Sequence, residues 1–533
     1  MSPKTVFVRD ATGIVRSISP WQAFVTTVSV AGIGTGAASM YVFVPFVWPG
    51  ADLALAAVLV VPFLLVHSAM YSMLAWSMPR SGGDYVWTGR ILHPAVGMSI
   101  NFTWLAYTAV LMGSWANYTV SYGMSSTLVS IGLVSRNLAI VEWGKALFAD
   151  PILLTIVGTV LIAYIAVIQI LGVQVYLKHQ LVYWAIGIIG TVLAIGLLLG
   201  KTQIQYAAAF DRAMSPYATY QGIVDSAKSA GFVWGGMSVV ATLGAMAYAW
   251  GANLGYQFSG YFSGELKQVR RAMFLSTMGS NVFCALFYAG FAWVFTSVVG
   301  YEWLHSLSYL AYGQPQAYNF PILPNPYFLA SLLTDNAVVA GIINFSLVVW
   351  GPILIGSNWL AFTRSLLAMS FDRVLPTALA DVSDRYHTPV KSIAVIAVVT
   401  WLGLMASLYY GVLFANMNFI FTVTIVFAIG AITAVVFPFR RKSMYDQTPI
   451  VRYKLAGVPL IVIAGIVSFF FFAYLAVDLG LNPVISGPTG PYATGLTIVC
   501  FIVSGLLYYA FRAYRKEREG IDIAVNFVQI PPE

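Results

Sequence analysis

Charged residues are scarce in this chain: Asp, Glu, Lys and Arg together make up 9% of its 533 residues. A soluble domain carries about 25% charged residues, so most of this surface does not face water. Hydrophobic residues make up 59% of the chain and are spread evenly along it. The composition therefore predicts one membrane-embedded unit rather than several soluble domains.

Cysteine and buried charge are also nearly absent. The two cysteines, Cys284 and Cys500, lie in separate apolar runs, which excludes a disulfide framework and a thiol metal site. No Asp, Glu, Lys or Arg lies near the middle of a predicted span, and His67 is the one ionisable group there. A membrane enzyme would need converging His, Asp, Glu or Cys side chains. We therefore predict no enzyme, no metal site and no carboxylate proton relay.

Long apolar runs are abundant instead. A helix crosses the hydrocarbon layer with roughly 20 apolar residues. The sequence predicts twelve such spans, near residues 20–47, 51–77, 94–130, 151–171, 178–200, 233–261, 272–300, 338–368, 392–411, 414–437, 456–478 and 493–513.

Basic residues are distributed unequally between the two sides of these spans. Five of the 27 Lys and Arg residues fall on one side, and the other 22 share the side of both termini. Such a bias marks cytoplasmic loops. We expect a multi-pass protein of the cytoplasmic membrane with both termini in the cytoplasm. The net charge of +8 then reflects the basic cytoplasmic loops, and no nucleic-acid partner is expected.

Two glycine-containing runs lie in the middle of predicted spans: 32–36 (GIGTG) in the first and 251–255 (GANLG) in the sixth. Glycine weakens a helix by about 1 kcal/mol relative to alanine and lets a ligand approach the backbone. Either run alone fits close helix packing through small residues. Two runs five spans apart, in corresponding halves of a five-plus-five repeat, favour the broken helices of a transporter.

Three further motifs lie in loops on the side of the termini. They are 78–85 (MPRSGGDY), 263–271 (SGELKQVRR) and the end of 364–376 (DRVLP). Together with 34–36 (GTG), they resemble the amino acid–polyamine–organocation superfamily, in the correct order over roughly the first ten spans. One departure is Gly187, near the position where some proton-coupled relatives carry a lysine.

The resemblance implies an all-α integral membrane fold of about twelve helices. Its leucine-transporter-type core has two inverted five-helix repeats with helices 1 and 6 broken, and two C-terminal helices follow. The expected organisation is a cytoplasmic N-terminal segment (1–18), the transporter core (19–437), two additional spans (438–513) and a cytoplasmic tail (514–533). The implied function is a permease that moves amino acids, neutral ones above all, by alternating access.

The resemblance also places the substrate between the two broken helices. The amides of Thr35 and Gly36 begin a half-helix and suit a carboxylate, whereas carbonyls that end half-helices suit an ammonium group. The expected substrate-binding residues are Ala31, Gly32, Gly34, Thr35, Gly36, Tyr107, Ala252, Asn253, Gly255 and Gln257. For Tyr107, Asn253 and Gln257, aromatic packing or interhelical hydrogen bonding is an equal alternative. Trp250 and Tyr256 flank the second break and are candidate gates.

Coupling is left open by the sequence. Ser357 and Asn358 stand roughly where related folds bind sodium, so Na⁺ is one candidate coupling ion and H⁺ another. Exchange or facilitated diffusion is the alternative, and no other cofactor is expected. A different small solute (an amine, a polyamine or a nucleobase) or a substrate sensor without transport also fits. The expected partners are the substrate and the lipid bilayer, and the sequence does not set the oligomeric state.

Overall fold

The fold is all-helical and multi-pass. The computed structural model describes residues 13–411, 419–481 and 490–531. Within these ranges the only strands are β1 (Lys454–Leu455) and β2 (Val458–Pro459), which form a small hairpin. Eleven helical stretches in them are long and apolar enough to cross a membrane: Pro20–Val47, Leu53–Ser77, Pro94–Val134, Pro151–Ile170, Val173–Leu198, Val269–Val299, Ala337–Phe371, Val390–Tyr409, Phe419–Arg440, Leu460–Leu481 and Gly490–Glu519. With the shorter apolar helix α13 (Val239–Ala252) they account for the twelve predicted spans.

Several of these stretches contain more than one helix. The helices of the first half are α1 (Pro20–Ala31), α2 (Ile33–Val47), α3 (Leu53–Leu59), α4 (Val61–Ser77), α6 (Pro94–Tyr118), α7 (Ser125–Val134), α9 (Pro151–Ile170) and α10 (Val173–Leu198). Those of the second half are α14 (Val269–Phe274), α15 (Ser280–Val299), α18 (Ala337–Phe371), α19 (Val390–Tyr409), α21 (Phe419–Arg440), α23 (Leu460–Leu481) and α25 (Gly490–Glu519).

Span boundaries differ from prediction at some ends. The third span passes from α6 to α7 through a π-helical turn (Thr119–Met124), so it continues to Val134. The fifth begins at Val173, five residues before the predicted 178. The predicted start of the tenth, at 414, lies outside the described residues. Helix α25 extends to Glu519, so the predicted tail boundary at 514 falls within a helix.

The first span is interrupted at Gly32. Helix α1 begins with a capping box in which Ser19 and Gln22 satisfy each other's backbone amides. It ends at Gly32, whose left-handed backbone (φ 57°, ψ 56°) costs little only for glycine, and α2 begins at the next residue. The predicted break in the first helix is therefore present.

The sixth span is interrupted after Ala252. Helix α13 ends there, and single turns at Phe258–Gly260 and Ser263–Glu265 replace its continuation. Gly255 has φ 150° and lies against the first break, because a Cβ on it would come within 2.6 Å of the Ala31 amide. The second predicted break is thus also present, and the two breaks are in direct contact.

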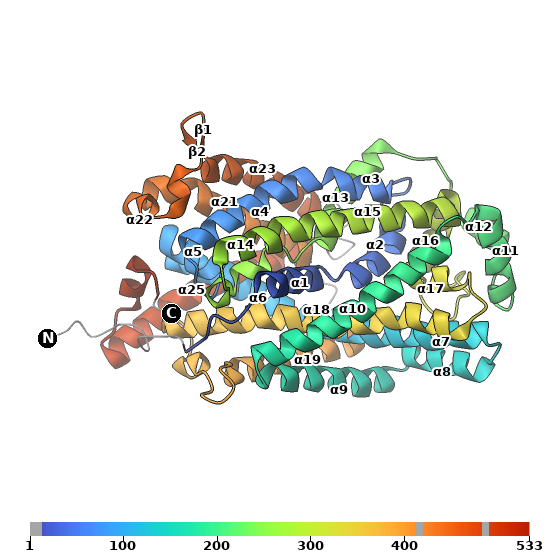
Figure 1. Cartoon of the computed structure of the whole chain (residues 1–533), viewed down its shortest axis with the longest axis horizontal. Helices are drawn as coiled ribbons and strands as arrows, with labels where there is room; N and C mark the ends of the chain where they lie inside the picture. Colours follow the sequence, from blue (N-terminus) through green and yellow to red (C-terminus); the bar gives the residue numbers. More distant parts are fainter. Residues whose placement is uncertain (1–12, 412–418, 482–489, 532–533) are drawn as a thin grey trace.

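Short helices cover the two ends of the bundle (Figure 1). One end holds α5 (Asp84–Ile91) and α22 (Lys442–Asp446), and we name it the α5 end. The opposite end, named the α11 end, holds α11 (Gln203–Met214) and α12 (Tyr220–Ser229). The remaining short helices are α8 (Leu138–Ala149), α16 (Tyr301–Gly313) and α17 (Pro326–Ser331). The segment 301–337 supplies α16 and α17, and both pack on α2.

The C-terminal segment binds to the α5 end. Its 3₁₀ turn, Ile523–Val528, buries Phe527 against Tyr85 and Arg90. The Arg90 guanidinium donates to the carbonyl of Gln529 at 2.9 Å and to the buried carboxylate of Asp372 at 3.0 Å. The segment therefore covers an ion pair that joins α5 to the end of α18.

Candidate functional site

A cavity of about 520 Å³ lies where the two breaks meet. This volume falls within the range of about 300–1,000 Å³ that is typical of small-molecule sites. Its walls come from α1, α2, α6, α13 and α18, with further residues from neighbouring elements. The lining residues are Val30, Ala31, Thr35, Gly36, Ala38, Ser39, Met40, Phe43, Trp104, Leu111, Met112, Ser114, Trp115, Tyr118, Tyr122, Gly123, Tyr248, Gly251, Ala252, Leu254, Phe258, Tyr312, Leu347, Leu354, Asn358, Phe419, Ile420 and Ala493.

The described lining contains no charged side chain. Its polar side-chain groups are the hydroxyls of Thr35, Ser39, Ser114 and four tyrosines, the Asn358 amide, and the indole N–H groups of Trp104 and Trp115. Nor do the described residues contain any cluster of three or more His, Cys, Asp or Glu residues that could hold a metal ion. An isolated ion buried here would have no counter-charge from a side chain. The cavity therefore suits a ligand without net charge.

The first turn of α2 presents backbone donors at the break. The amides of Ile33, Gly34 and Thr35 have no carbonyl one turn earlier in their own helix, because α2 begins at Ile33, directly after the left-handed residue Gly32. The Gly36 amide, predicted to bind a carboxylate, instead donates to the Gly32 carbonyl at 2.6 Å. Gly36 contributes to the site as a lining residue, and the free helix N-terminus ends at Thr35.

Tyr288, on α15, connects the two breaks. Its hydroxyl lies 3.0 Å from the carbonyl oxygen of Ala252 and 3.3 Å from that of Ala31. These carbonyls end the two half-helices and are among those expected to face an ammonium group. A Cβ at Gly36 would overlap the Tyr288 hydroxyl, so glycine at this position makes room for the phenol. Tyr288 was not predicted, because nothing in the sequence distinguishes it from the other 30 tyrosines.

Five of the predicted residues line the cavity: Ala31, Thr35, Gly36, Ala252 and Asn358. The others are placed outside this lining. Gly34 faces Trp350, and a Cβ there would overlap the indole. The Gly32 carbonyl accepts from Thr35 Oγ1 at 2.9 Å.

The predicted polar residues of the sixth span stabilise its break. The Asn253 side chain donates to the carbonyl of Ala249 at 2.8 Å. The Gln257 side chain accepts from the Gly255 amide at 3.2 Å. These bonds satisfy backbone groups that the interrupted helix leaves without partners.

The predicted aromatic residues lie behind the cavity wall. Trp250 is fully buried and packs on Phe427 and Phe472. The Tyr256 hydroxyl lies 2.6 Å from Nδ1 of His67. Tyr107 points to α25, where its hydroxyl lies 3.2 Å from Oγ1 of Thr497. The rings that line the space between the breaks and the α11 end are instead Phe43, Tyr118, Tyr122, Tyr248 and Tyr312.

Ser357 takes part in a neutral network between three helices. Its hydroxyl accepts from Nε2 of Gln180 at 2.6 Å and lies 2.8 Å from the Tyr176 hydroxyl. Thr26 on α1 donates to the other end of the Gln180 amide at 3.0 Å. The neighbouring Asn358 donates to the carbonyl of Leu354 at 2.8 Å. The Ser357 hydroxyl, predicted for sodium, is thus bonded to protein groups in this structure.

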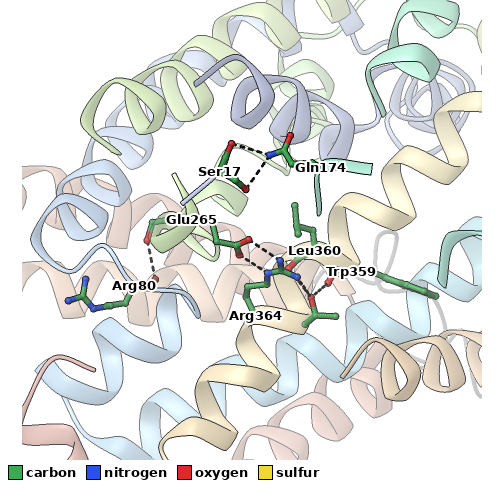
Figure 2. Close-up of polar contacts among 9 residues, drawn as sticks. Ser17, Arg80, Gln174, Glu265, Trp359, Leu360 and Arg364 are labelled. Carbon is green, nitrogen blue, oxygen red and sulfur yellow. Dashed lines mark hydrogen bonds and ion pairs between the residues drawn. The ribbon is translucent and has the colours of Figure 1, made fainter. Parts of the chain in front are cut away.

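The side of the breaks toward the α5 end is closed by a buried ion pair. Arg364, on α18, donates from Nε to Glu265 Oε1 at 2.6 Å and from Nη2 to Oε2 at 2.9 Å, and both side chains are 1% exposed. Figure 2 shows the two side chains facing each other, with Ser17 and Gln174 bonded nearby. Ile18 also bonds by backbone to both sides of Leu266, accepting from Lys267 and donating to Glu265. The ion pair therefore joins the segment after the sixth span to α18, and neither of its residues belongs to the cavity lining.

Comparison with known proteins adds the family. The family model described as amino acid permease matches residues 18–510, which is most of the chain. A search of curated proteins finds no match. The matched range includes both helix breaks, the cavity and the buried ion pair, and on that basis the chain belongs to the amino acid permease family.

Proposed function

We propose that this protein is a secondary transporter that carries neutral amino acids across the cytoplasmic membrane by alternating access. The observation that carries the proposal is the uncharged cavity at two contacting helix breaks. Backbone amides at the start of α2 suit the substrate carboxylate, and the carbonyls of Ala31 and Ala252 suit its ammonium group. A zwitterion is then bound without a charged side chain.

The positions of the two breaks support an inverted-repeat core of the leucine-transporter type. They fall in the first and sixth spans, which begin successive groups of five. In this arrangement one helix group rocks against the other around a fixed site. The α5 end carries the basic loops and corresponds to the cytoplasm.

The buried ion pair supports the alternating-access step. Glu265 follows the sixth span, whereas Arg364 belongs to α18, so their bond holds two different spans together on the cytoplasmic side of the site. Opening the site to the cytoplasm requires these groups to separate and become hydrated. The ion pair then stabilises the state that is closed to the cytoplasm.

Uptake by proteoliposomes tests the proposal. The full chain is reconstituted and offered pooled radiolabelled neutral amino acids in three conditions: a sodium gradient, a proton gradient, and unlabelled amino acid inside. Saturable uptake is expected, and the condition that supports it identifies the coupling. Replacing sodium with choline, with Ser357→Ala alongside, tests the sodium hypothesis. A folded protein that carries no amino acid under any condition would refute the proposal.

A further inference from the structure

The cavity is lined by an unusual number of aromatic rings. Nine of its lining residues are Phe, Tyr or Trp, and eight more are Leu, Ile, Val or Met. Amino acids with small or polar side chains need neither the volume nor this surface. The lining therefore indicates the kind of substrate side chain, whereas the helix breaks concern only the carboxylate and ammonium groups.

The rings form two groups along the cavity. The inner group consists of Trp104, Phe258 and Phe419; Trp104 stacks on Phe419 with centroids 5.2 Å apart and meets Phe258 at 6.3 Å. The outer group includes Phe43, which contacts the rings of Tyr248 and Tyr312 at 5.3 and 5.1 Å. Because the rings within each group hold one another, the apolar wall is formed before a substrate arrives.

We propose that this site selects amino acids with large apolar side chains, aromatic ones above all. The inference rests on the proposed function and specifies its substrate class. Backbone groups at the breaks bind the α-carboxylate and α-ammonium, and the side chain fills the space beside the aromatic groups. Ring faces and edges there offer the offset and edge-to-face contacts that aromatic side chains prefer.

The same lining rejects other side chains. Lys, Arg, Asp and Glu would bring a charge into a space whose described lining offers no counter-ion. Alanine, glycine and serine would leave most of the cavity of about 520 Å³ unfilled, so most lining side chains would make no contact with the substrate. One methylene group in an apolar pocket changes kcat/KM by about 10- to 200-fold. The kcat/KM for an amino acid with a benzyl side chain should therefore exceed that for one with a methyl side chain by at least about tenfold.

Competition in proteoliposomes tests the substrate class. The full chain takes up radiolabelled phenylalanine against unlabelled tryptophan, tyrosine, leucine, methionine, alanine, glycine, lysine and glutamate. We expect kcat/KM for phenylalanine to exceed that for alanine by at least about tenfold, with no competition from lysine or glutamate. Preference for alanine or glycine would overturn this inference and leave the proposed function standing. Transport of a charged amino acid would overturn both this inference and the restriction of the proposed function to neutral substrates. Failure of every amino acid would overturn both.

A matched pair of variants tests where the side chain lies. Ser39 lines the cavity and is solvent-accessible, and its hydroxyl donates to the carbonyl three residues earlier. Ser407, on α19, makes the same local bond and is not a lining residue. Ser39→Phe should lower the phenylalanine-to-alanine ratio of kcat/KM by at least about tenfold, whereas Ser407→Phe should leave it unchanged. An unchanged ratio in folded Ser39→Phe protein would contradict the placement.

Discussion

The buried pair of Glu265 and Arg364 makes a quantitative prediction. Both side chains are 1% exposed, and two parallel hydrogen bonds of 2.6 and 2.9 Å join them. Removing one member of a buried pair leaves the other charge unpaired, which costs about 3–5 kcal/mol, whereas replacing both by apolar groups is close to neutral. Glu265→Met and Arg364→Met should each be strongly destabilising, and the variant with both changes should recover much of the loss.

The assay is thermal unfolding of the four purified proteins in detergent, followed by tryptophan fluorescence. An exposed pair provides the control: Lys391 and Asp381 lie 2.6 Å apart but are 59% and 57% exposed. Lys391→Met should cost no more than about 1 kcal/mol. The reasoning is that an unpaired buried charge destabilises the protein. It would be refuted if the losses in free energy of unfolding added in the double variant, or if each single variant lost as little as Lys391→Met.

Three further predictions follow from contacts elsewhere. Gly36→Ala places a methyl group on the Tyr288 hydroxyl and should abolish uptake, whereas Gly196→Ala, which has open space, should leave it unchanged; equal uptake by both would contradict the site. Burial raises the pKa of Asp84 to about 6, so the folded state binds the proton more tightly than the unfolded chain, whose Asp pKa is about 3.9. The folded state then gains about 1.4 kcal/mol per pH unit as pH falls from about 6 to about 4, and no more below that; thermal midpoints should show this gain, and Asp84→Asn should remove it. Deleting residues 520–533 removes the buried side chains of Ile523 and Phe527, and losing their burial should cost about 3–6 kcal/mol; an unchanged midpoint would contradict the described docking.

The fold was largely accessible from the sequence because its determinants are local. Apolar runs of sufficient length predict spans without knowledge of their neighbours. The first break follows from glycine at position 32, where the left-handed conformation of the backbone is cheapest for that residue. The second lies within the run 251–255, where Gly255 has φ 150°. These elements needed no tertiary information.

The walls of the site were less accessible because helix rotation is set by packing. Tyr107 was a candidate for substrate binding with packing as an equal alternative, and in the structure its hydroxyl lies 3.2 Å from Oγ1 of Thr497 on α25. Tyr288 contacts both breaks from a helix that carried no motif. Glu265 and Arg364 each belonged to a recognised motif, but they are 99 positions apart, and no local pattern pairs them.

The phenol of Tyr288 bears on what happens when the carrier is empty. Its hydroxyl lies within hydrogen-bond distance of the carbonyls that end two half-helices at membrane depth. Under the proposed function, an arriving ammonium group would take the place of this hydroxyl at the two carbonyl oxygens. When the substrate leaves, the same hydroxyl would return to them, so the empty site would keep a neutral donor that bridges the two breaks.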